Sequence, residues 1–139
     1  MTQNKTVLPE GWKRPPGFSH AMLSPGVNLV MAGQFGWDPA SRQCVEGGFV
    51  PQWEQALQNV RTLVEEVGGE VTDIVGLRVL VLSMSEYRGA GSGAGEAWGR
   101  VFGRHFPAIT LFEVGGLTDP DARLEVEAYA SVPDSKDSK

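Results

Sequence analysis

A change in hydrophobic spacing near the middle of the chain constrains its fold more than any other feature. From Gln52 onward, apolar residues recur at steps of three and four, as they do on one face of a helix: Trp53, Ala56, Leu57, Val60, Leu63, Val64 and Val67. Gly68 and Gly69 follow and predict the end of that helix. The next run, residues 74–82, is rich in β-branched residues and predicts a central strand covered on both faces. The chain must therefore pack at least one amphipathic helix on a sheet.

The other predicted elements complete an α+β pattern. Two short apolar runs, residues 19–23 and 29–32, flank turn-forming residues and predict a β-hairpin. Residues 85–104 predict a second helix, which begins near Gly95 or is broken there, because each glycine of the 89–95 segment costs about 1 kcal/mol inside a helix. Residues 109–114 and 123–132 predict two last strands. The order β-β-α-β-α-β-β describes two helices on one face of a mixed sheet.

The ends of the chain differ from its middle. Residues 1–16 are polar, and their prolines and glycine oppose regular structure, which predicts an arm that orders only against the body or a neighbouring subunit. Residues 133–139 form a short solvated tail. Residues 17–132 are thus expected to be one domain, as suits a chain of 139 residues.

Charge and composition restrict the partners. A net charge of −5 argues against a chain-wide attraction to nucleic acid. The single cysteine, Cys44, cannot form an intramolecular disulfide, and no segment resembles a signal peptide or a membrane span. We therefore expect a cytoplasmic protein with a small-molecule ligand and with neither nucleic acid nor membrane as a partner. Two histidines far apart in sequence give no reason to expect a metal, and no cofactor is expected.

Several short motifs occur in an order that resembles the RidA/YjgF family of enamine and imine deaminases. They are Phe18-Ser19-His20-Ala21, Ala32-Gly33-Gln34, the helix from Gln55, Gly68-Gly69, Asp73-Ile74-Val75, Phe106-Pro107-Ala108 and Glu125-Val126-Glu127-Ala128. The similarity covers residues 16–132. It implies a chorismate-mutase-like fold and a homotrimer with three ligand clefts between subunits.

The resemblance also implies which residues line the cleft. Glu125 matches the strand carboxylate that orients water, and Gly33 matches a glycine whose main chain lines the pocket. The family's substrate-binding arginine is replaced by Ile109. Its tyrosine, cysteine and asparagine are likewise replaced, by Phe18, Leu111 and Gly95 respectively. These four changes remove polar groups, so we expect a more apolar cleft, roomier near Gly95, for a bulkier or partly aromatic ligand.

Other interpretations of these residues remain open. Glu125 and Glu127 alternate along one strand face and are equally explained as solvated carboxylates or as partners of Arg78 or Arg123. Burial next to Phe18 and Leu111 would instead raise the pKa of Glu125 and suit it to acid–base work. His20, beside Phe18, is a candidate cleft residue. Arg104 and His105 either replace the lost cation or simply complement a helix dipole.

Three functions fit these patterns. The first is an enamine or imine hydrolase with altered substrate choice, in which Glu125 is catalytic and Phe18, His20, Gly33, Gly95, Ile109 and Leu111 bind the substrate. The second is a non-catalytic module that binds or senses a small metabolite. The third, an endoribonuclease, is least compatible with the acidic charge.

Overall fold

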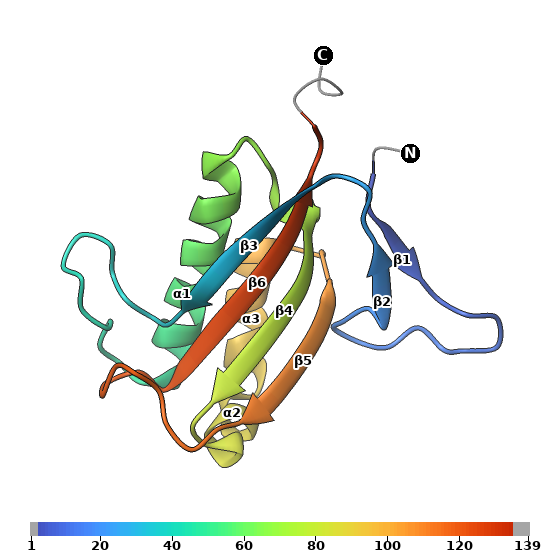
Figure 1. Ribbon diagram of the computed structural model, residues 1–139. Coiled ribbons are helices and arrows are strands. Elements are labelled where there is room, and N and C mark those ends of the chain that lie inside the picture. Colours follow the sequence, from blue (N-terminus) through green and yellow to red (C-terminus); the bar gives the residue numbers. More distant parts are fainter. Residues whose placement is uncertain (1–2, 135–139) are drawn as a thin grey trace.

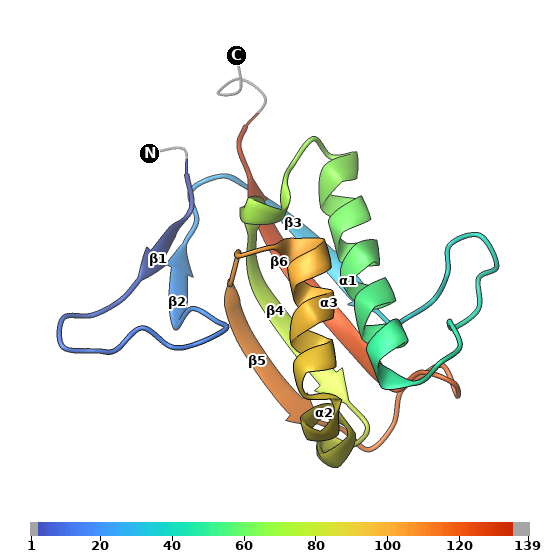
Figure 2. The same ribbon diagram turned by 180° about the vertical axis from the view of Figure 1, so that it is seen from behind.

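The computed structural model describes residues 3–134 and contains a four-stranded sheet with all its helices on one face (Figures 1 and 2). The strand order is β3 (Val27–Gln34), β6 (Leu124–Val132), β4 (Ile74–Val81) and β5 (Ala108–Glu113). β6 runs antiparallel to both of its neighbours, whereas β4 and β5 are parallel. The predicted α+β class and mixed sheet are therefore confirmed.

The helix α1 (Phe49–Glu66) places most of the predicted apolar stripe on the sheet, but Leu63 and Val67 are exposed and do not belong to the buried face. Leu57, Val60 and Val64 are fully buried in the core. The helix begins three residues before Gln52, since Pro51 in its first turn needs no hydrogen-bond donor there. It ends as predicted: the N–H of Gly68 donates to Glu65 O at 3.0 Å, with Gly68 at φ 84°. Of the helices described, none is both long and apolar enough to cross a lipid bilayer.

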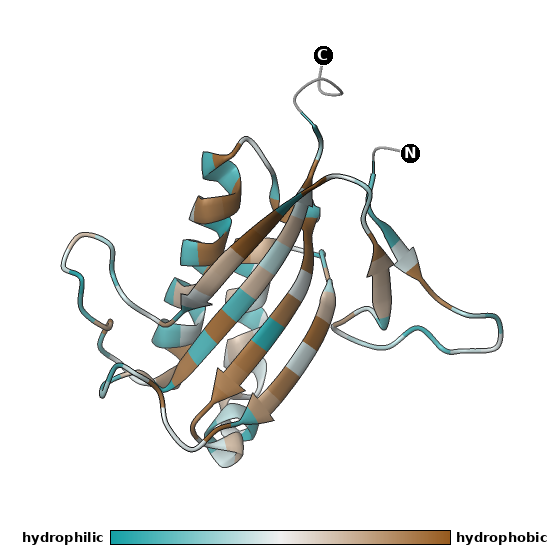
Figure 3. Ribbon diagram, viewed as in Figure 1, coloured by the Kyte–Doolittle hydropathy of each residue, from teal (hydrophilic) through white to brown (hydrophobic). Residues whose placement is uncertain are grey.

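The central strand β4 is covered on one face only. Ile74, Leu77, Val79 and Val81 are buried against the helices, whereas Arg78 on the opposite face is exposed. The prediction of a strand covered on both faces is wrong for the single chain, because both long helices, α1 and α3 (Ser92–Phe102), lie on the same side. Figure 3 shows the uncovered face, where hydrophilic and hydrophobic residues alternate along the strands.

The predicted hairpin does not form, and part of the arm is a strand. β2 (Ala21–Leu23) pairs with β1 (Lys5–Val7), while β3 pairs with β6. The turn-forming segment fixes the chain to the end of β6: the N–H of Gly26 donates to Ser131 Oγ at 2.8 Å. A Cβ at Gly26 would clash with the carbonyl oxygen of Val132, so this contact requires glycine. The segment therefore directs β3 along β6 and away from β2.

The second predicted helix is two helices separated by one glycine. α2 (Met84–Ala90) ends and α3 begins at Gly91, whose φ of 52° and ψ of −129° form a conformation rarely open to other residues. A break within the glycine-rich segment is confirmed, but its predicted place near Gly95 is wrong, because the break lies at Gly91 and Gly95 is inside α3.

Gly91 and Gly89 should respond oppositely to the same substitution. Gly91→Ala is expected to lower the free energy of unfolding by about 1–3 kcal/mol, because alanine is strained at this φ. Gly89→Ala, inside α2, is expected to raise it by about 0.5–1 kcal/mol, since a Cβ there meets no atom within 4 Å. Urea unfolding of both variants measures these changes in the free energy of unfolding. Equal changes in the two variants would contradict a helix break at Gly91.

Candidate functional site

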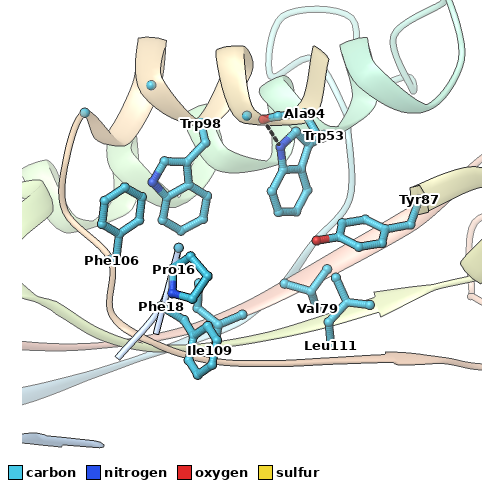
Figure 4. A pocket seen from close by; sticks show the side chains of 14 residues that line it. Pro16, Phe18, Trp53, Val79, Tyr87, Ala94, Trp98, Phe106, Ile109 and Leu111 are labelled. Atoms are coloured by element: carbon cyan, nitrogen blue, oxygen red, sulfur yellow. Dashed lines mark hydrogen bonds between the residues drawn. The ribbon is translucent and has the colours of Figure 1, made fainter. Parts of the chain in front are cut away.

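A pocket of about 630 Å³ lies between α3, the strands β4 and β5, and the end of the N-terminal arm (Figure 4). Its walls are almost entirely apolar or aromatic. The residues that line it are Pro16, Gly17, Phe18, Trp53, Val79, Tyr87, Ala94, Gly95, Trp98, Gly99, Gly103, Phe106, Ile109 and Leu111. No Asp, Glu, Lys, Arg or His side chain within residues 3–134 lines it, so it favours an apolar and uncharged ligand.

Aromatic rings form the helix side of the pocket. Trp98 stacks on Phe106 with ring centroids 6.0 Å apart and on Trp53 at 6.2 Å. Both indole N–H groups are held by main-chain carbonyls: Trp53 donates to Ala94 O at 3.0 Å and Trp98 to His105 O at 3.2 Å. These bonds fix the rings, which present flat apolar surfaces to the cavity.

Four of the residues expected in the cleft meet in this pocket: Phe18, Gly95, Ile109 and Leu111. Ile109 and Leu111 are two residues apart in β5 and share the face that looks toward the helices. Phe18 reaches them because Ser19 is tied to the start of β5, its N–H donating to Pro107 O at 2.9 Å and its Oγ to Phe106 O at 2.6 Å. A Cβ at Gly95 would meet no atom within 4 Å, so the pocket is open there.

Glu125 and Gly33 lie on the opposite, uncovered face of the sheet. Along β6, Leu124, Val126 and Ala128 point toward the helices, so Glu125 points away from them. Its carboxyl packs directly over Gly33 in β3, where a Cβ would come within 2.6 Å of Glu125 Cδ. Within one chain, therefore, Glu125 is separated from Phe18 and Leu111 by the sheet itself.

The surroundings of Glu125 favour its protonated form. Partial burial, and secondly the charge of Glu127, raise the pKa of the Glu125 carboxyl above its ordinary value. The pKa of Glu125 is therefore raised, as expected. The cause is burial on the uncovered face of the sheet together with Glu127, and not contact with Phe18 or Leu111. No group within residues 3–134 donates a hydrogen bond to this carboxyl, so its oxygens are available to a water or a ligand.

The basic residues considered as partners of the two glutamates are engaged elsewhere. Arg123 forms two hydrogen bonds with Glu86, each 2.9 Å long. Arg78 lies over the ring of Phe112, 5.9 Å from its centroid. Glu127 accepts a hydrogen bond of 3.0 Å from the hydroxyl of Tyr129. The two carboxylates therefore form no ion pair within the described part of the chain.

Neither histidine lines the pocket. His20 is exposed, with its ring edge-on between Trp12 at 5.1 Å and Phe18 at 5.4 Å. His105 Nε2 lies 2.7 Å from Ile74 O, which fixes the segment between α3 and β5. Arg104 is exposed and borders a neighbouring polar hollow. Across residues 3–134, no three His, Cys, Asp or Glu side chains gather as metal ligands would.

Several pocket residues were not expected from the sequence, notably Trp53, Val79 and Tyr87. Trp53 and Val79 carry the same apolar periodicity as any core residue, so the pattern predicts burial but not a cavity beside them. Tyr87 lies in the short helix α2, and only its position opposite β5 brings it to the pocket.

Gly33→Ala tests how the carboxyl of Glu125 is held. The added Cβ would require the Glu125 side chain to move outward, so the pKa of Glu125 is expected to fall toward its ordinary value. Carboxyl-carbon NMR titration measures this pKa directly. Gly116→Ala is a matched control, because a Cβ at Gly116 meets no atom within 4 Å. An unchanged pKa of Glu125 in Gly33→Ala would show that Gly33 does not set its environment.

A family model described as Endoribonuclease L-PSP matches residues 13–132. The chain therefore belongs to this family, known also as RidA/YjgF. Among its relatives, the 2-iminobutanoate/2-iminopropanoate deaminase of Capra hircus is 32% identical over 102 residues, which cover 73% of this chain and 71% of that protein. A RutC family protein of Pyrococcus horikoshii is 27% identical over 91% of this chain and 96% of its own length.

Solved structures agree with this assignment. The Rid family protein YyfB of Yersinia pestis, whose function is unknown, superposes with a TM-score of 0.79 at 28% identity and covers 95% of this chain and 100% of its own. The YjgF protein of E. coli gives a TM-score of 0.65 at 27% identity, over 91% of this chain and 98% of its own. The expected family and its fold are thereby confirmed.

Proposed function

We propose that this protein binds an apolar or aromatic imine or enamine in the pocket and hydrolyses it to a carbonyl compound and ammonia. The observation that carries this proposal is the convergence of Phe18, Gly95, Ile109 and Leu111 in one uncharged cavity. Support for the reaction type comes from the relatives named as imine deaminases. Support for the altered substrate choice comes from the cavity wall, to which residues 3–134 contribute no cationic side chain.

The proposal requires a second copy of the chain, because Glu125 and the pocket lie on opposite faces of one sheet. The uncovered face carries apolar side chains beside the glutamates, including Val30, which is 73% exposed, and the half-buried Leu80 and Phe112. Such a surface is suited to association. In a homotrimer, Glu125 of one subunit would face the pocket of the next.

The proposed reaction needs only water and one carboxyl. The oxygen of water adds to the carbon of the C=N bond while Glu125 accepts a proton from that water. Glu125 then returns that proton to the imine nitrogen, which gives a hemiaminal. It next takes the proton of the hemiaminal hydroxyl and passes it to the amine nitrogen as the C–N bond breaks, so that ammonia leaves and the C=O bond forms. A raised pKa favours a group that must both accept and donate a proton near neutral pH.

A panel of imines generated in solution tests substrate choice. Ammonia release above the spontaneous rate is expected for imines with an aromatic or long apolar group, and not for small imino acids. Ile109→Arg, which restores a cation to the pocket, is the matched variant and should favour the imino acids. Faster hydrolysis of small imino acids by the unmodified protein would contradict the proposal.

Binding without turnover is the second candidate function. It is favoured by one observation, the position of Glu125 on the face of the sheet away from the pocket. Sedimentation equilibrium separates the two candidates, because a species of three times 15.0 kDa is required for hydrolysis and not for binding. A monomer that binds the aromatic compounds but releases no ammonia would leave binding as the function.

RNA cleavage is not proposed, although the family model's description names an endoribonuclease. Phosphate recognition depends on basic groups, and the described residues place none in the pocket wall. A net charge of −5 also weighs against RNA as the substrate.

A further inference from the structure

Three side chains in the pocket wall carry polar atoms, and two of these atoms are already bonded. They belong to Trp53, Trp98 and Tyr87. Both indole N–H groups donate to main-chain carbonyls, as described above. The hydroxyl of Tyr87 has no partner within residues 3–134. It is thus the one side-chain hydrogen-bonding group that the described part of this chain leaves free in the pocket wall.

The hydroxyl of Tyr87 points into the cavity. Figure 4 shows it directed inward from α2, between Trp53 on one side and Val79 and Leu111 on the other. The ring is held edge-on by Phe49, with the centroids 6.2 Å apart. A free hydroxyl in such an apolar wall favours ligands that can bond to it, because a ligand without a matching polar group would displace the water that otherwise bonds to the hydroxyl.

The first turn of α2, the helix that carries Tyr87, is fixed by hydrogen bonds at Ser83, Met84 and Glu86. Ser83 Oγ accepts the N–H of Glu86 at 3.1 Å, and the N–H of Met84 donates to Glu113 Oε1 at 2.8 Å. The carboxylate of Glu86 accepts two hydrogen bonds from the guanidinium of Arg123. These contacts hold α2 against the ends of β5 and β6 and so set the direction of the tyrosine ring.

From this arrangement we infer that the ligand is an apolar or aromatic molecule with one uncharged polar group, and that this group bonds to the hydroxyl of Tyr87. A hydroxyl both donates and accepts, so a phenol, a carbonyl oxygen or an imine nitrogen would each match it. A carboxylate or ammonium group would enter without an opposite charge from the wall and is disfavoured. The inference rests on the proposed function of the pocket and adds the residue that selects its ligand.

Tyr87→Phe removes the hydroxyl and keeps the ring. We expect the unmodified protein to bind para-ethylphenol about tenfold more tightly than the variant does, as loss of one hydrogen bond predicts. Ethylbenzene, of the same shape, should bind both proteins equally. Para-ethylbenzoate should bind the unmodified protein at least about tenfold more weakly than the phenol. NMR titration of isotope-labelled protein gives the three affinities.

The outcomes separate this inference from the proposed function. Equal affinity of the two proteins for para-ethylphenol, with binding retained, would overturn the role of Tyr87 and leave the pocket intact. Benzoate binding as tight as that of the phenol would overturn the preference for an uncharged group. Absence of binding of all three compounds would overturn the proposed apolar site itself. Gly95→Leu, which fills the open space at Gly95, should abolish binding of both neutral probes and so places them in this pocket.

Discussion

Glu125→Gln is expected to reduce enzymatic ammonia release by about 10²–10⁴-fold, the usual contribution of a positioned acid–base group. Glutamine has almost the same shape but can neither accept nor return a proton in this reaction. Affinity for the aromatic probes should be retained, since the substitution keeps the side-chain shape and leaves the apolar wall of the pocket unchanged. Steady-state rates above the spontaneous background, together with the NMR affinities, measure both effects.

The pH dependence gives this prediction a direction. Because Glu125 must be ionised to accept a proton in the proposed reaction, the rate should rise as pH passes upward through its pKa, which burial and Glu127 hold above the ordinary value. Glu127→Gln removes the neighbouring charge and should move this rise to lower pH. The protonated carboxyl is favoured by the folded state, so its contribution to stability is present below the unfolded pKa and is lost as pH rises through the folded pKa. A rate profile unaffected by either variant would contradict a catalytic role for Glu125.

Leu57→Ala is expected to lower the free energy of unfolding by about 2–5 kcal/mol, because it leaves a cavity in a fully buried site. Leu57 is 0% exposed and lies at the centre of the interface between α1 and the sheet. Urea unfolding curves of the two proteins, fitted with the same dependence of free energy on urea concentration, give the difference in the free energy of unfolding.

Leu63→Ala is the matched control for this loss. Leu63 lies in the same helix and is 37% exposed, so the same substitution should cost less than about 1 kcal/mol. Similar losses for the two variants would mean that the inner face of α1 has been misassigned.

The helix and the central strand could be predicted because their patterns are local. The spacing of Trp53, Leu57 and Val64 specifies a buried helical face whatever that face contacts. The pairing of the first strands could not be predicted in the same way. Pro25 and Asn28 indicate a turn, but the partner of β3 is decided by the contact of Gly26 with Ser131, more than one hundred positions away along the sequence.

The site was predictable in part for a similar reason. Ile109 and Leu111 lie two residues apart on one strand, so the presence of apolar residues at both positions already predicts an apolar cleft. Alternation along β6 already predicts that Glu125 lies on the face away from the helices, but which face of the sheet carries the cleft depends on where α3 and the N-terminal arm pack. Tyr87 carries no periodic signal, because α2 is only seven residues long.

The position of β6 in the sheet has a consequence for biosynthesis. β6 lies between β3 and β4, yet it follows both of them in the chain. As the polypeptide leaves the ribosome, β3 and β4 are made without the strand that joins them, and their edges remain unpaired until residues 124–132 emerge. Sheet completion thus waits for the synthesis of β6, and chains terminated before residue 124 would expose two unpaired strand edges for chaperones or proteases to recognise.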